Sequence, residues 1–515
     1  MNTYEKEFLS YTPPELPQDL TNIPNRVSST FTDKTVLITG GTGFVGKLII
    51  ENLLRKSPRV KRIYLLLRSK KEKEPKQRIE ELFLSPLFDY LKKLHGNDVI
   101  EKVIPIHGDI GELYLGINEN DYKILTNEVE IFYHVAATVR FDEPLKKTIL
   151  LNTRGTKFTL ELAKGMTNLK LFMYISTAYC HPNEKVLLEK AYSPPDDPHK
   201  MIKVIETLDE GSVDYTSKRI LGDYPNGYAY SKCLAEHLIV EQIKAGLPCI
   251  ICRPSIVVPI WNDPLPGWTD NLNGPLGLLT AAGKGILRSM YGNPNIWADF
   301  IPADIVVNGI QIFTWNYIEN NDTERNIVNI TSTDEIKITW GEIIDMGKHI
   351  AYSGLPMNNC VWYPGGSMTK CRVYHNIRVF FLQTIPAYFL DAIIYLSGNK
   401  PCLVKIQERI NKGYEIFNFY VNNQWEFSSK MSRQIREKLN AREKFEYKFN
   451  LDGVDVRKYF KNSIMGARIY LLKEMPDTLP RARRHMKIMC FVHYTTQLLL
   501  FGLFLWFLMK LIKYN

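Results

Sequence analysis

The chain has 515 residues, of which 45% are hydrophobic and 23% charged, and its formal net charge is +10. These values exclude a disordered or fibrous protein and allow a globular protein of two or three domains. The positive charge favours anionic ligands or an anionic lipid surface. Eight cysteines do not form a disulfide framework, and no set of Cys and His has zinc spacing. We therefore predict reduced thiols, no bound metal and no nucleic-acid partner.

The first segment, residues 1–31, is predicted to be an irregular N-terminal extension. It has prolines at positions 13, 14, 17 and 24 and no long apolar run, and no signal peptide is visible in it. The first strand pattern, Thr35–Thr39, follows soon after, and its β-branched apolar residues are typical of a buried parallel strand.

A glycine-rich loop follows this strand and precedes a helical pattern over Lys47–Lys56. Its glycines fit both Gly-x-x-Gly-x-x-Gly and Gly-x-Gly-x-x-Gly. Strand, loop and helix in this order predict a dinucleotide site, in which the loop backbone approaches a pyrophosphate at the helix N-terminus. The predicted loop comprises Gly40, Gly41, Thr42, Gly43, Phe44, Val45 and Gly46.

The end of the second predicted strand, Arg62–Leu67, indicates which dinucleotide binds. An NAD site places an acidic residue there, whereas this chain has a basic cluster from Arg68 to Lys71. Such a cluster suits the 2′-phosphate of NADPH. We expect Arg68 to contact that phosphate and most of Lys70, Lys71 and Lys73 to be solvated.

Further strand patterns alternate with helical patterns, which predicts a doubly wound, Rossmann-type parallel α/β sheet. The strands are predicted at Val103–Ile106, Ile131–Val135, Leu171–Ile175 and Cys249–Val258, and helices fall at Asn152–Lys164 and Ala229–Ala245. Cys249 and Cys252 match Cys-x-x-Cys but face opposite sides of a strand, so we interpret both as core residues.

In such a sheet, ligands bind at the carboxyl ends of the strands. We therefore expect residues at these ends to line the cofactor and the substrate. Asp109 and Ile110 are predicted to border the adenine, Ala136 and Ala137 the cofactor backbone, and Ser176 and Thr177 the substrate carbonyl. Pro254, Ser255 and Ile256 are further predicted cofactor contacts.

Tyr228 and Lys232 are the candidate catalytic pair. At a spacing of four residues they share one helix face, so the lysine can reach a cofactor ribose while its charge favours ionisation of the tyrosine. The phenol then serves as a proton donor near neutral pH. We expect the Thr177 hydroxyl to help Tyr228 stabilise an oxyanion during hydride transfer.

Two apolar segments follow in the second half of the chain. Val379–Ser397 is interrupted by Pro386 and Asp391, so a full membrane crossing is doubtful. It forms either a hairpin or amphipathic surface that lies against a membrane or lines an acyl channel, or part of a domain core. Ile488–Met509 has 22 residues without Asp, Glu, Lys or Arg and predicts a transmembrane helix.

The charges that flank this helix predict its orientation. Arg481, Arg483, Arg484 and Lys487 precede it, whereas Lys510 and Lys513 follow it. The heavier positive side predicts catalytic domains that face the cytosol, and the short C-terminal remainder predicts a tail anchor in membrane lipid. The endoplasmic reticulum is the first expectation for the membrane, with the peroxisome as alternative.

Several longer strings narrow the assignment. They are Thr39-Gly-Gly-Thr-Gly-Phe-Val-Gly46, His134-Val-Ala-Ala-Thr-Val-Arg-Phe-Asp142, Ile175-Ser-Thr-Ala-Tyr179, Tyr224-Pro-Asn-Gly-Tyr-Ala-Tyr-Ser-Lys232, Arg253-Pro-Ser-Ile-Val257 and Pro264-Leu-Pro-Gly-Trp268. Together with Trp425-Glu-Phe427 and the stretch from Tyr459 to Glu474, they resemble the alcohol-forming fatty acyl-CoA reductases of the extended short-chain dehydrogenase/reductase superfamily. The resemblance runs from about Lys34 to Glu474.

The resemblance implies reduction of a long-chain acyl-CoA by two NADPH to a primary alcohol and free CoA. In that chemistry Tyr228 and Thr177, beside Ser176, would hold the thioester carbonyl, and Lys232 would anchor the nicotinamide ribose. Two other classes stay open. They are another membrane-bound extended reductase acting on a sterol or nucleotide sugar, and a non-catalytic NADPH-binding scaffold.

The same resemblance divides the chain into four parts. After the extension over 1–31 come a predicted NADPH-binding reductase domain over 32–358 and a smaller, mainly helical C-terminal domain over 359–476. The transmembrane helix over 488–509 completes the chain. Acyl-chain preference, oligomeric state and pathway do not follow from the sequence.

Overall fold

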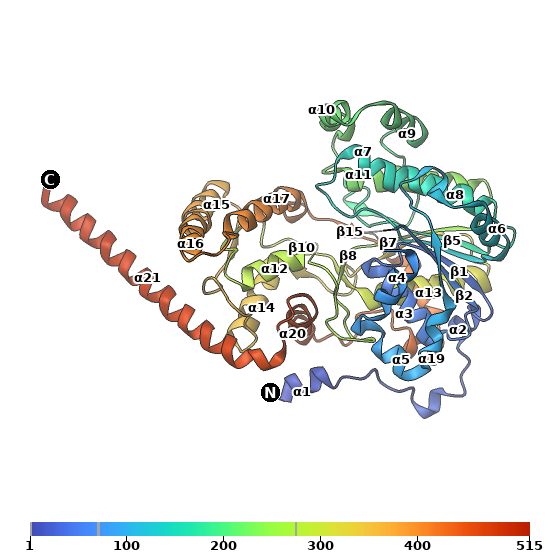
Figure 1. Cartoon of the computed structure of the whole chain (residues 1–515), viewed down its shortest axis with the longest axis horizontal. Coiled ribbons are helices and arrows are strands. Elements are labelled where there is room, and N and C mark those ends of the chain that lie inside the picture. Colours follow the sequence, from blue (N-terminus) through green and yellow to red (C-terminus); the bar gives the residue numbers. More distant parts are fainter. Residues whose placement is uncertain (1–2, 70–72, 273–274, 515) are drawn as a thin grey trace.

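A parallel sheet of seven strands forms the centre of the computed structural model, which describes residues 3–69, 73–272 and 275–514 (Figure 1). The strand order is β12-β7-β5-β4-β1-β2-β3, so the chain winds outward in opposite directions from β1 and β4. This order is that of a doubly wound dinucleotide-binding sheet and confirms the predicted fold class. Lys70 and Lys71 of the predicted basic cluster lie outside the described residues.

Most strands coincide with the predicted apolar runs. The sheet comprises β1 (Thr35–Thr39), β2 (Arg62–Leu67), β3 (Val103–His107), β4 (Ile131–His134), β5 (Leu171–Ile175), β7 (Cys249–Pro254) and β12 (Ile327–Ile330). Val36 of β1 pairs with Ile63 of β2 on one side and with Ile131 of β4 on the other. The strand β12 was not predicted, because its apolar run is short and interrupted by Asn329.

The prediction of one strand over Cys249–Val258 was wrong. The strand β7 ends at Pro254, and the N–H of Ser255 donates to the carbonyl of Ile330 at 3.0 Å. The chain then leaves the sheet as β8 (Ile256–Val258), which pairs with β11 (Phe300–Pro302). A proline at the strand end has no N–H to continue the ladder, which favours this break.

Helices cover both faces of the sheet (Figure 1). One face carries α3 (Phe44–Lys56), α5 (Asp89–His95) and α13 (Ala303–Glu319), and the other carries α6 (Glu119–Glu128), α8 (Gly155–Lys164) and α11 (Gly227–Lys244). The helix predicted from Lys47 begins at Phe44, and the one predicted from Asn152 begins as a π-helix over Ile149–Arg154. Further helices are α4 (Pro75–Phe83), α9 (Pro198–Thr207) and α10 (Glu210–Leu221).

Each face of the sheet has its own hydrophobic core. Val36 and Ile38 of β1 join the core beneath α3 and α13, whereas Leu37 joins the core beneath α8 and α11. Cys252 belongs to the first core and Cys249 to the second, and both thiols are free and buried. The interpretation of the Cys-x-x-Cys pair as core residues on opposite faces is therefore confirmed.

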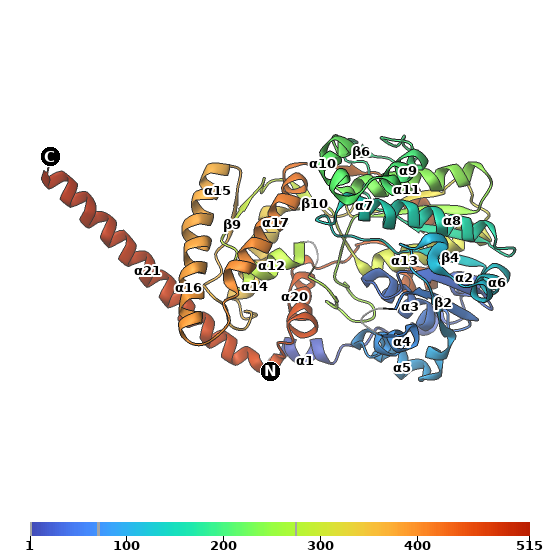
Figure 2. The same ribbon diagram turned by 45° about the horizontal axis from the view of Figure 1, so that its top comes forward.

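A second, largely helical region lies beside the part of the molecule that contains the seven-stranded sheet (Figures 1 and 2). Its helices include α12 (Pro275–Gly283), α14 (Trp340–Tyr352), α15 (Arg372–Val379), α16 (Ile385–Leu396), α17 (Leu403–Asn422) and α20 (Val456–Gly466). The small helices α18 (Lys430–Glu437) and α19 (Ala441–Glu446) return beneath the sheet, where Ile435 enters the core of the first face.

The N-terminal extension is more ordered than predicted. It contains α1 (Thr3–Leu9) and α2 (Arg26–Thr30), and it runs along the lower edge of the molecule (Figure 1). Phe8 packs into an apolar cluster with Met465 and Leu479, and Glu5 pairs with Arg483 at 2.5 Å. Long-range packing against the C-terminal region thus orders a segment that has no apolar run of its own.

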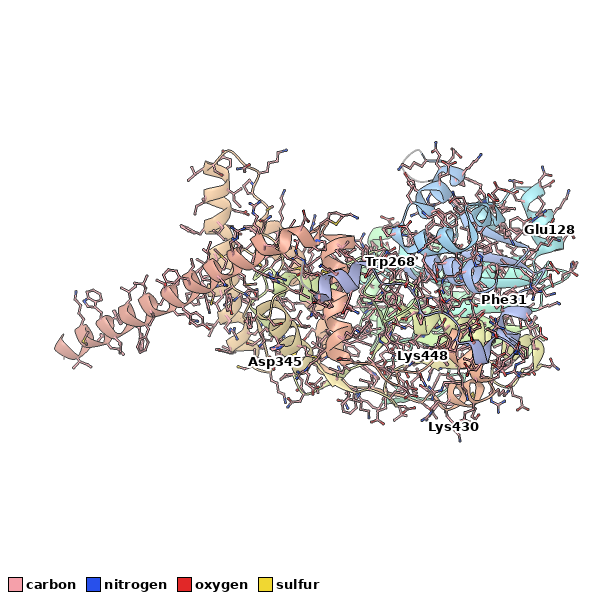
Figure 3. All side chains as sticks on the ribbon, turned by 90° about the horizontal axis from the view of Figure 1, so that it is seen from below. Phe31, Glu128, Trp268, Asp345, Lys430 and Lys448 are labelled. Atoms are coloured by element: carbon pink, nitrogen blue, oxygen red, sulfur yellow. The ribbon has the colours of Figure 1, made fainter. Side chains whose placement is uncertain are left out.

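The chain ends in one long helix, α21 (Leu479–Tyr514). Its first turns pack against the body, where the indole of Trp362 donates to His493 Nδ1 at 3.1 Å. From Leu498 to Ile512 the side chains are exposed and mostly apolar. The distal part of the helix stands clear of the body (Figure 3). The predicted span Ile488–Met509 lies within this helix, which is long and apolar enough to cross a membrane.

Candidate active site

The glycine loop turns sharply at the end of β1 and leads directly into α3. Gly40 has a φ of +72°, and a Cβ at this position would lie 2.7 Å from the backbone N of Ala136. A Cβ at Gly46 would lie 2.2 Å from the carbonyl oxygen of Gly40. Both positions therefore require glycine. With Gly43 as N-cap, the free N–H groups of the first turn of α3 form a site that fits a pyrophosphate.

Two arginines lie beside this loop. Arg68 pairs with Asp109 at 3.2 Å, and Arg78 of α4 donates to the Thr42 hydroxyl at 2.9 Å and to the Arg68 carbonyl at 2.7 Å. Burial, together with the charge of Arg68, lowers the pKa of Arg78 from its ordinary value. This close pair of cations fits a phosphate on the adenosine ribose. Sequence reasoning missed Arg78 because α4 folds back to bring it beside the loop.

The segment after β4 is tied to the catalytic helix. The N–H of Ala136 donates to the Thr39 hydroxyl at 3.2 Å. The buried side chain of Asn152 accepts the Thr138 N–H at 2.8 Å and donates to the Ser231 hydroxyl at 3.0 Å. Asn152, which sequence reasoning also missed, thus joins the predicted cofactor wall around Ala136 and Ala137 to α11.

Tyr228 and Thr177 meet at the carboxyl edge of the sheet, with Ser176 beside Thr177. Asn226 caps the helix α11 by accepting the Ala229 N–H at 2.9 Å, which places Tyr228 in the first turn. The Thr177 hydroxyl accepts the N–H of Tyr179 at 3.2 Å and lies near enough to Tyr228 to lower the pKa of its phenol. Ser176 is 4% exposed, and its buried hydroxyl has no hydrogen-bond partner among the described residues. Two hydroxyls and a phenol therefore face a site that fits a substrate oxygen.

The electrostatics of Tyr228 differ from the expectation. Burial, followed by the effect of Tyr420, raises the pKa of Tyr228 above its usual range, so the phenol keeps its proton at neutral pH. The expected ionisation of Tyr228 by Lys232 is not seen in this state, because burial dominates the pKa of the phenol. A protonated phenol remains suited to proton donation.

Lys232 lies one turn after Tyr228 and is 2% exposed. Its ammonium donates to the carbonyl of Ile175 at 2.7 Å and lies 4.5 Å from the centre of the Tyr174 ring. Burial lowers the pKa of Lys232 to about 8. One donor is therefore used to hold the lysine at the end of β5, beside Ser176, and the others are available to a ligand.

A buried ion pair joins the catalytic helix α11 to the strand β7. Arg253 of β7 donates to both carboxylate oxygens of Glu236 at 2.9 and 2.6 Å. Although burial alone would raise it, Arg253 holds the pKa of Glu236 well below its usual range. Cys180 and His181 also contact this carboxylate at 3.2 and 3.1 Å. We assign no metal to this group because a guanidinium already neutralises the carboxylate.

The remaining predicted cofactor contacts lie where β7 leaves the sheet. The carbonyl of Pro254 accepts the N–H of Ala178 at 2.9 Å, and the N–H of Ile256 donates to the carbonyl of Asp299 at 3.2 Å. These bonds place Pro254, Ser255 and Ile256 next to the end of β5. The structure thus brings all predicted strand-end residues to one edge of the sheet.

The helical region contributes a wall to the site. Tyr420 of α17 accepts a hydrogen bond from the Asn226 amide at 3.1 Å. The ring centre of Phe141 lies 5.3 Å from that of Tyr228 and 5.6 Å from that of Tyr420. Sequence reasoning missed Tyr420 because it lies almost two hundred positions after Tyr228 and no local pattern links the two.

A small cavity borders this aromatic wall, and a larger one next to it lies in the helical region. The smaller one is lined in part by Tyr179 and Tyr420, and it shares Ala298 and Trp340 with the larger one. The larger cavity has mainly apolar walls from several elements, including Leu279, Met290, Phe300, Ile343, Phe460 and Ile464. The arrangement as a whole provides a phosphate-binding loop, a proton donor and an apolar compartment.

Comparisons with known proteins agree with this arrangement. Two family models, each described as male sterility protein, match residues 38–310 and 382–474. Fatty acyl-CoA reductase 1 of Rattus norvegicus is 36% identical over 453 residues, which cover 88% of this chain and 87% of the relative. Fatty acyl-CoA reductase wat of Drosophila melanogaster is 35% identical over 483 residues, covering 94% and 93%.

Solved structures support the fold alone. The reductase domain of a nonribosomal peptide synthetase from Mycobacterium tuberculosis aligns with a TM-score of 0.56 at 18% identity, covering 87% of this chain and 96% of that one. The terminal reductase domain from the myxalamid pathway aligns with a TM-score of 0.54 at 20% identity, covering 91% and 95%.

Proposed function

This chain belongs to the fatty acyl-CoA reductase family and is an oxidoreductase, and on that premise we propose that it reduces long-chain fatty acyl-CoA to a primary alcohol with NADPH. The observation that carries the proposal is the constellation of Thr177, Tyr228 and Lys232, which Phe141 and Tyr420 connect with the smaller cavity and, through its shared walls, with the larger apolar one. A sugar substrate would need polar walls there, whereas an acyl chain needs apolar ones.

The residues present fit NADPH. The glycine cradle and the N-terminus of α3 would hold the pyrophosphate, and Arg68 and Arg78 would hold the 2′-phosphate. The remaining ammonium donors of Lys232 would bind the nicotinamide ribose. Bound NADPH supplies the hydride.

The protein's own part is to bind and protonate the carbonyl oxygen. Tyr228 and Thr177 donate hydrogen bonds to the thioester oxygen, and the phenol gives up its proton as hydride addition makes that oxygen an anion. The resulting hemithioacetal expels CoA as the thiol and leaves an aldehyde. After Tyr228 has taken up a proton from solvent and a second NADPH has replaced the spent cofactor, the same groups would protonate the aldehyde oxygen in a second reduction, which yields the alcohol.

We assign the acyl chain to the apolar cavities. Tyr420 and Tyr179 connect the phenol of Tyr228 with the smaller cavity, and the shared walls at Ala298 and Trp340 lead into the larger one. Burial of each methylene contributes about 0.8 kcal/mol, so this compartment favours long chains over short ones.

The domain boundaries and the location follow from the same reading. We propose a reductase domain over 32–358, to which α18 and α19 return, a smaller domain over 359–476, against which α12 and α14 pack, and a lipid anchor in the distal part of α21. We place the catalytic region on the cytosolic side of the endoplasmic reticulum, with the peroxisomal membrane as alternative, since more positive charge precedes the apolar segment than follows it.

A substrate panel tests the proposal. The purified full chain is incubated with NADPH and, in separate reactions, palmitoyl-CoA, a sterol and a nucleotide sugar. We expect hexadecanol and free CoA from the first reaction and no turnover in the others. Turnover of the sterol or the sugar alone would contradict the proposal, and tight NADPH binding without any turnover would favour a scaffold.

A further inference from the structure

An exposed apolar helix lies in the helical region, separate from the C-terminal anchor. The segment Arg372–Leu396, here termed the outer helix, consists of α15, a π-helical turn over Phe380–Thr384, and α16. Large apolar side chains on it are 51 to 83% exposed, among them Phe380, Phe381, Tyr388, Phe389, Tyr395 and Leu396. A contiguous apolar surface of this kind marks an interaction site.

From Arg378 onward the polar side chains of the outer helix are turned inward. Gln383 accepts the backbone N–H groups of Arg288 and Ser289 at 2.6 and 3.1 Å. Arg378 donates to the carbonyl of Arg288 at 3.0 Å. Asp391 accepts three backbone N–H groups at the start of α17, each at 2.9 Å. Only the first turns expose polar side chains, Arg372 and Asn376, and the rest of the helix buries its polar groups and exposes apolar ones, which is the reverse of a helix on a water-facing surface.

This packing explains the proline and the carboxylate that interrupt the apolar run. Pro386 comes directly after the π-helical turn over Phe380–Thr384, where the regular hydrogen-bond pattern of the helix is already interrupted, and Asp391 caps the next helix. The inner side of the outer helix rests on α17 and on β9 (Ser289–Tyr291) along its length. A full crossing would carry these elements into the bilayer, so the helix is suited to lie in the membrane surface.

The position of the outer helix relative to α21 indicates which partner covers its apolar face. Both lie at the end of the molecule away from the seven-stranded sheet, and the distal part of α21 leaves the body on this side (Figures 1 and 2). Exposed basic residues lie at both ends of the outer helix, with Lys370 before it, Arg372 at its first position, and Lys400 and Lys405 after it. Positive charge beside an apolar helix face is complementary to anionic lipid headgroups.

We propose that the outer helix inserts its apolar face into the surface of the same bilayer that holds α21, so that the protein contacts the membrane at two places. The inference rests on the proposed membrane anchor. It also places the acyl cavity next to the membrane surface, because Ser289 and Ser367 line that cavity and are hydrogen-bonded to Gln383 and Arg378 of the outer helix. An acyl-CoA partitioned in lipid reaches the cavity at this end of the molecule.

Fluorescence quenching on the full chain tests this docking. Cys371, Cys402 and Cys490, the cysteines that are not buried, are changed to Ser. Single cysteines are then introduced as Phe389→Cys, Leu396→Cys, Leu505→Cys and Tyr215→Cys and labelled with an environment-sensitive dye. Tyr215 on α10 is 91% exposed and lies far from the outer helix, so it is the matched control. The proteins are reconstituted into phosphatidylcholine vesicles that contain about 20% phosphatidylserine, which gives the vesicles a negative surface potential.

We expect dyes at positions 389 and 396 to be quenched by nitroxide lipids and shielded from iodide, as the dye at position 505 is, whereas the dye at position 215 shows the reverse. Lipid quenching at 389 and 396 without quenching at 505 would still support the outer helix and would reject α21 as the anchor. Iodide quenching at 389 and 396 overturns the proposal. Shielding of both positions from both quenchers also overturns it, because a protein partner then covers the face. Alcohol formation by the same samples reports separately on the proposed function.

Discussion

The sheet region and the helical region handle polar groups in opposite ways. Around the sheet, charges such as Glu236, Arg253 and Lys232 are buried beneath the reacting edge, and each has a specific partner. In the helical region the interior holds an apolar cavity, and the outer helix turns apolar side chains toward the exterior. The region around the sheet therefore supplies positioned protons and charges, whereas the helical region supplies an apolar cavity and an apolar surface.

The largest effect is expected at the proton donor. Tyr228→Phe removes the phenolic proton and leaves the ring, so kcat/KM for palmitoyl-CoA should fall by about 10²- to 10⁴-fold. Tyr215→Phe, at an exposed position on α10, serves as the control and should retain full activity. Retention of alcohol formation by Tyr228→Phe would assign the chemistry to another group.

Removal of one partner of the buried ion pair should lower the stability of the fold. Glu236→Gln leaves Arg253 charged and buried, so the free energy of unfolding should fall by about 3 to 5 kcal/mol. Glu206→Gln breaks a pair with Arg154 near the surface and should cost about 1 kcal/mol or less. Denaturant titrations of both variants measure the difference, and equal losses would mean that the buried pair has no special role.

A smaller effect is expected at the arginine that the sequence did not predict. Arg78→Met should raise the KM for NADPH by about tenfold to a hundredfold, since one charged hydrogen bond contributes about 1.5 to 3 kcal/mol. The KM for NADH, which has no 2′-phosphate, should stay constant. Arg62→Met, at the opposite end of β2, is the control. Equal changes for both cofactors would place Arg78 in the loop's structure and not in phosphate recognition.

In the helical region, a change in cavity volume should alter the acyl-chain preference. A Cβ at Gly347 meets no atom within 4 Å, and this residue lines the larger cavity, so Gly347→Leu fills space without a clash at the backbone. We expect the preferred acyl chain to become shorter, with kcat/KM for stearoyl-CoA relative to lauroyl-CoA reduced about tenfold. Gly413→Leu on α17, also free of close neighbours but outside the cavity, should leave the profile unchanged.

The smallest effect is a dependence on pH. Lys232 has a pKa of about 8 in the folded chain, so its charge and kcat/KM should fall as pH rises through 8. The unfolded chain, with a lysine pKa of about 10.4, binds more protons between these values, so stability should rise over the same window. Lys232→Met should abolish this rise, as measured by unfolding at pH 7 and pH 10. A rise that persists in the variant would belong to another group.

Much of the sheet could be predicted from the sequence because buried parallel strands are continuous apolar runs. Thr35–Thr39, Arg62–Leu67 and Leu171–Ile175 are strands with the predicted bounds. The strand β12 was missed because Asn329 interrupts it, and β7 was drawn too long because apolar residues continue past Pro254. Local hydrophobicity does not register where a neighbouring strand ends.

The site was predicted only where residues follow strands or share a helix. The glycine loop, Thr177, Tyr228 and Lys232 have local signals, and the structure brings them to one edge. Arg78 and Tyr420 have none, because the folding back of α4 and the packing of α17 place them there. The raised pKa of Tyr228 also could not be predicted, since burial depends on the tertiary structure.

The central claim is that one set of groups carries out both reductions with NADPH. The full chain is given palmitoyl-CoA and NADPH that carries deuterium at the transferred position, and the alcohol is analysed by mass spectrometry. We expect hexadecanol with two deuterium atoms at C1. In Tyr228→Phe, we expect alcohol formation from palmitoyl-CoA and from added hexadecanal to be lost in parallel. Alcohol with a single deuterium, or a variant that reduces added hexadecanal at the normal rate, would contradict it.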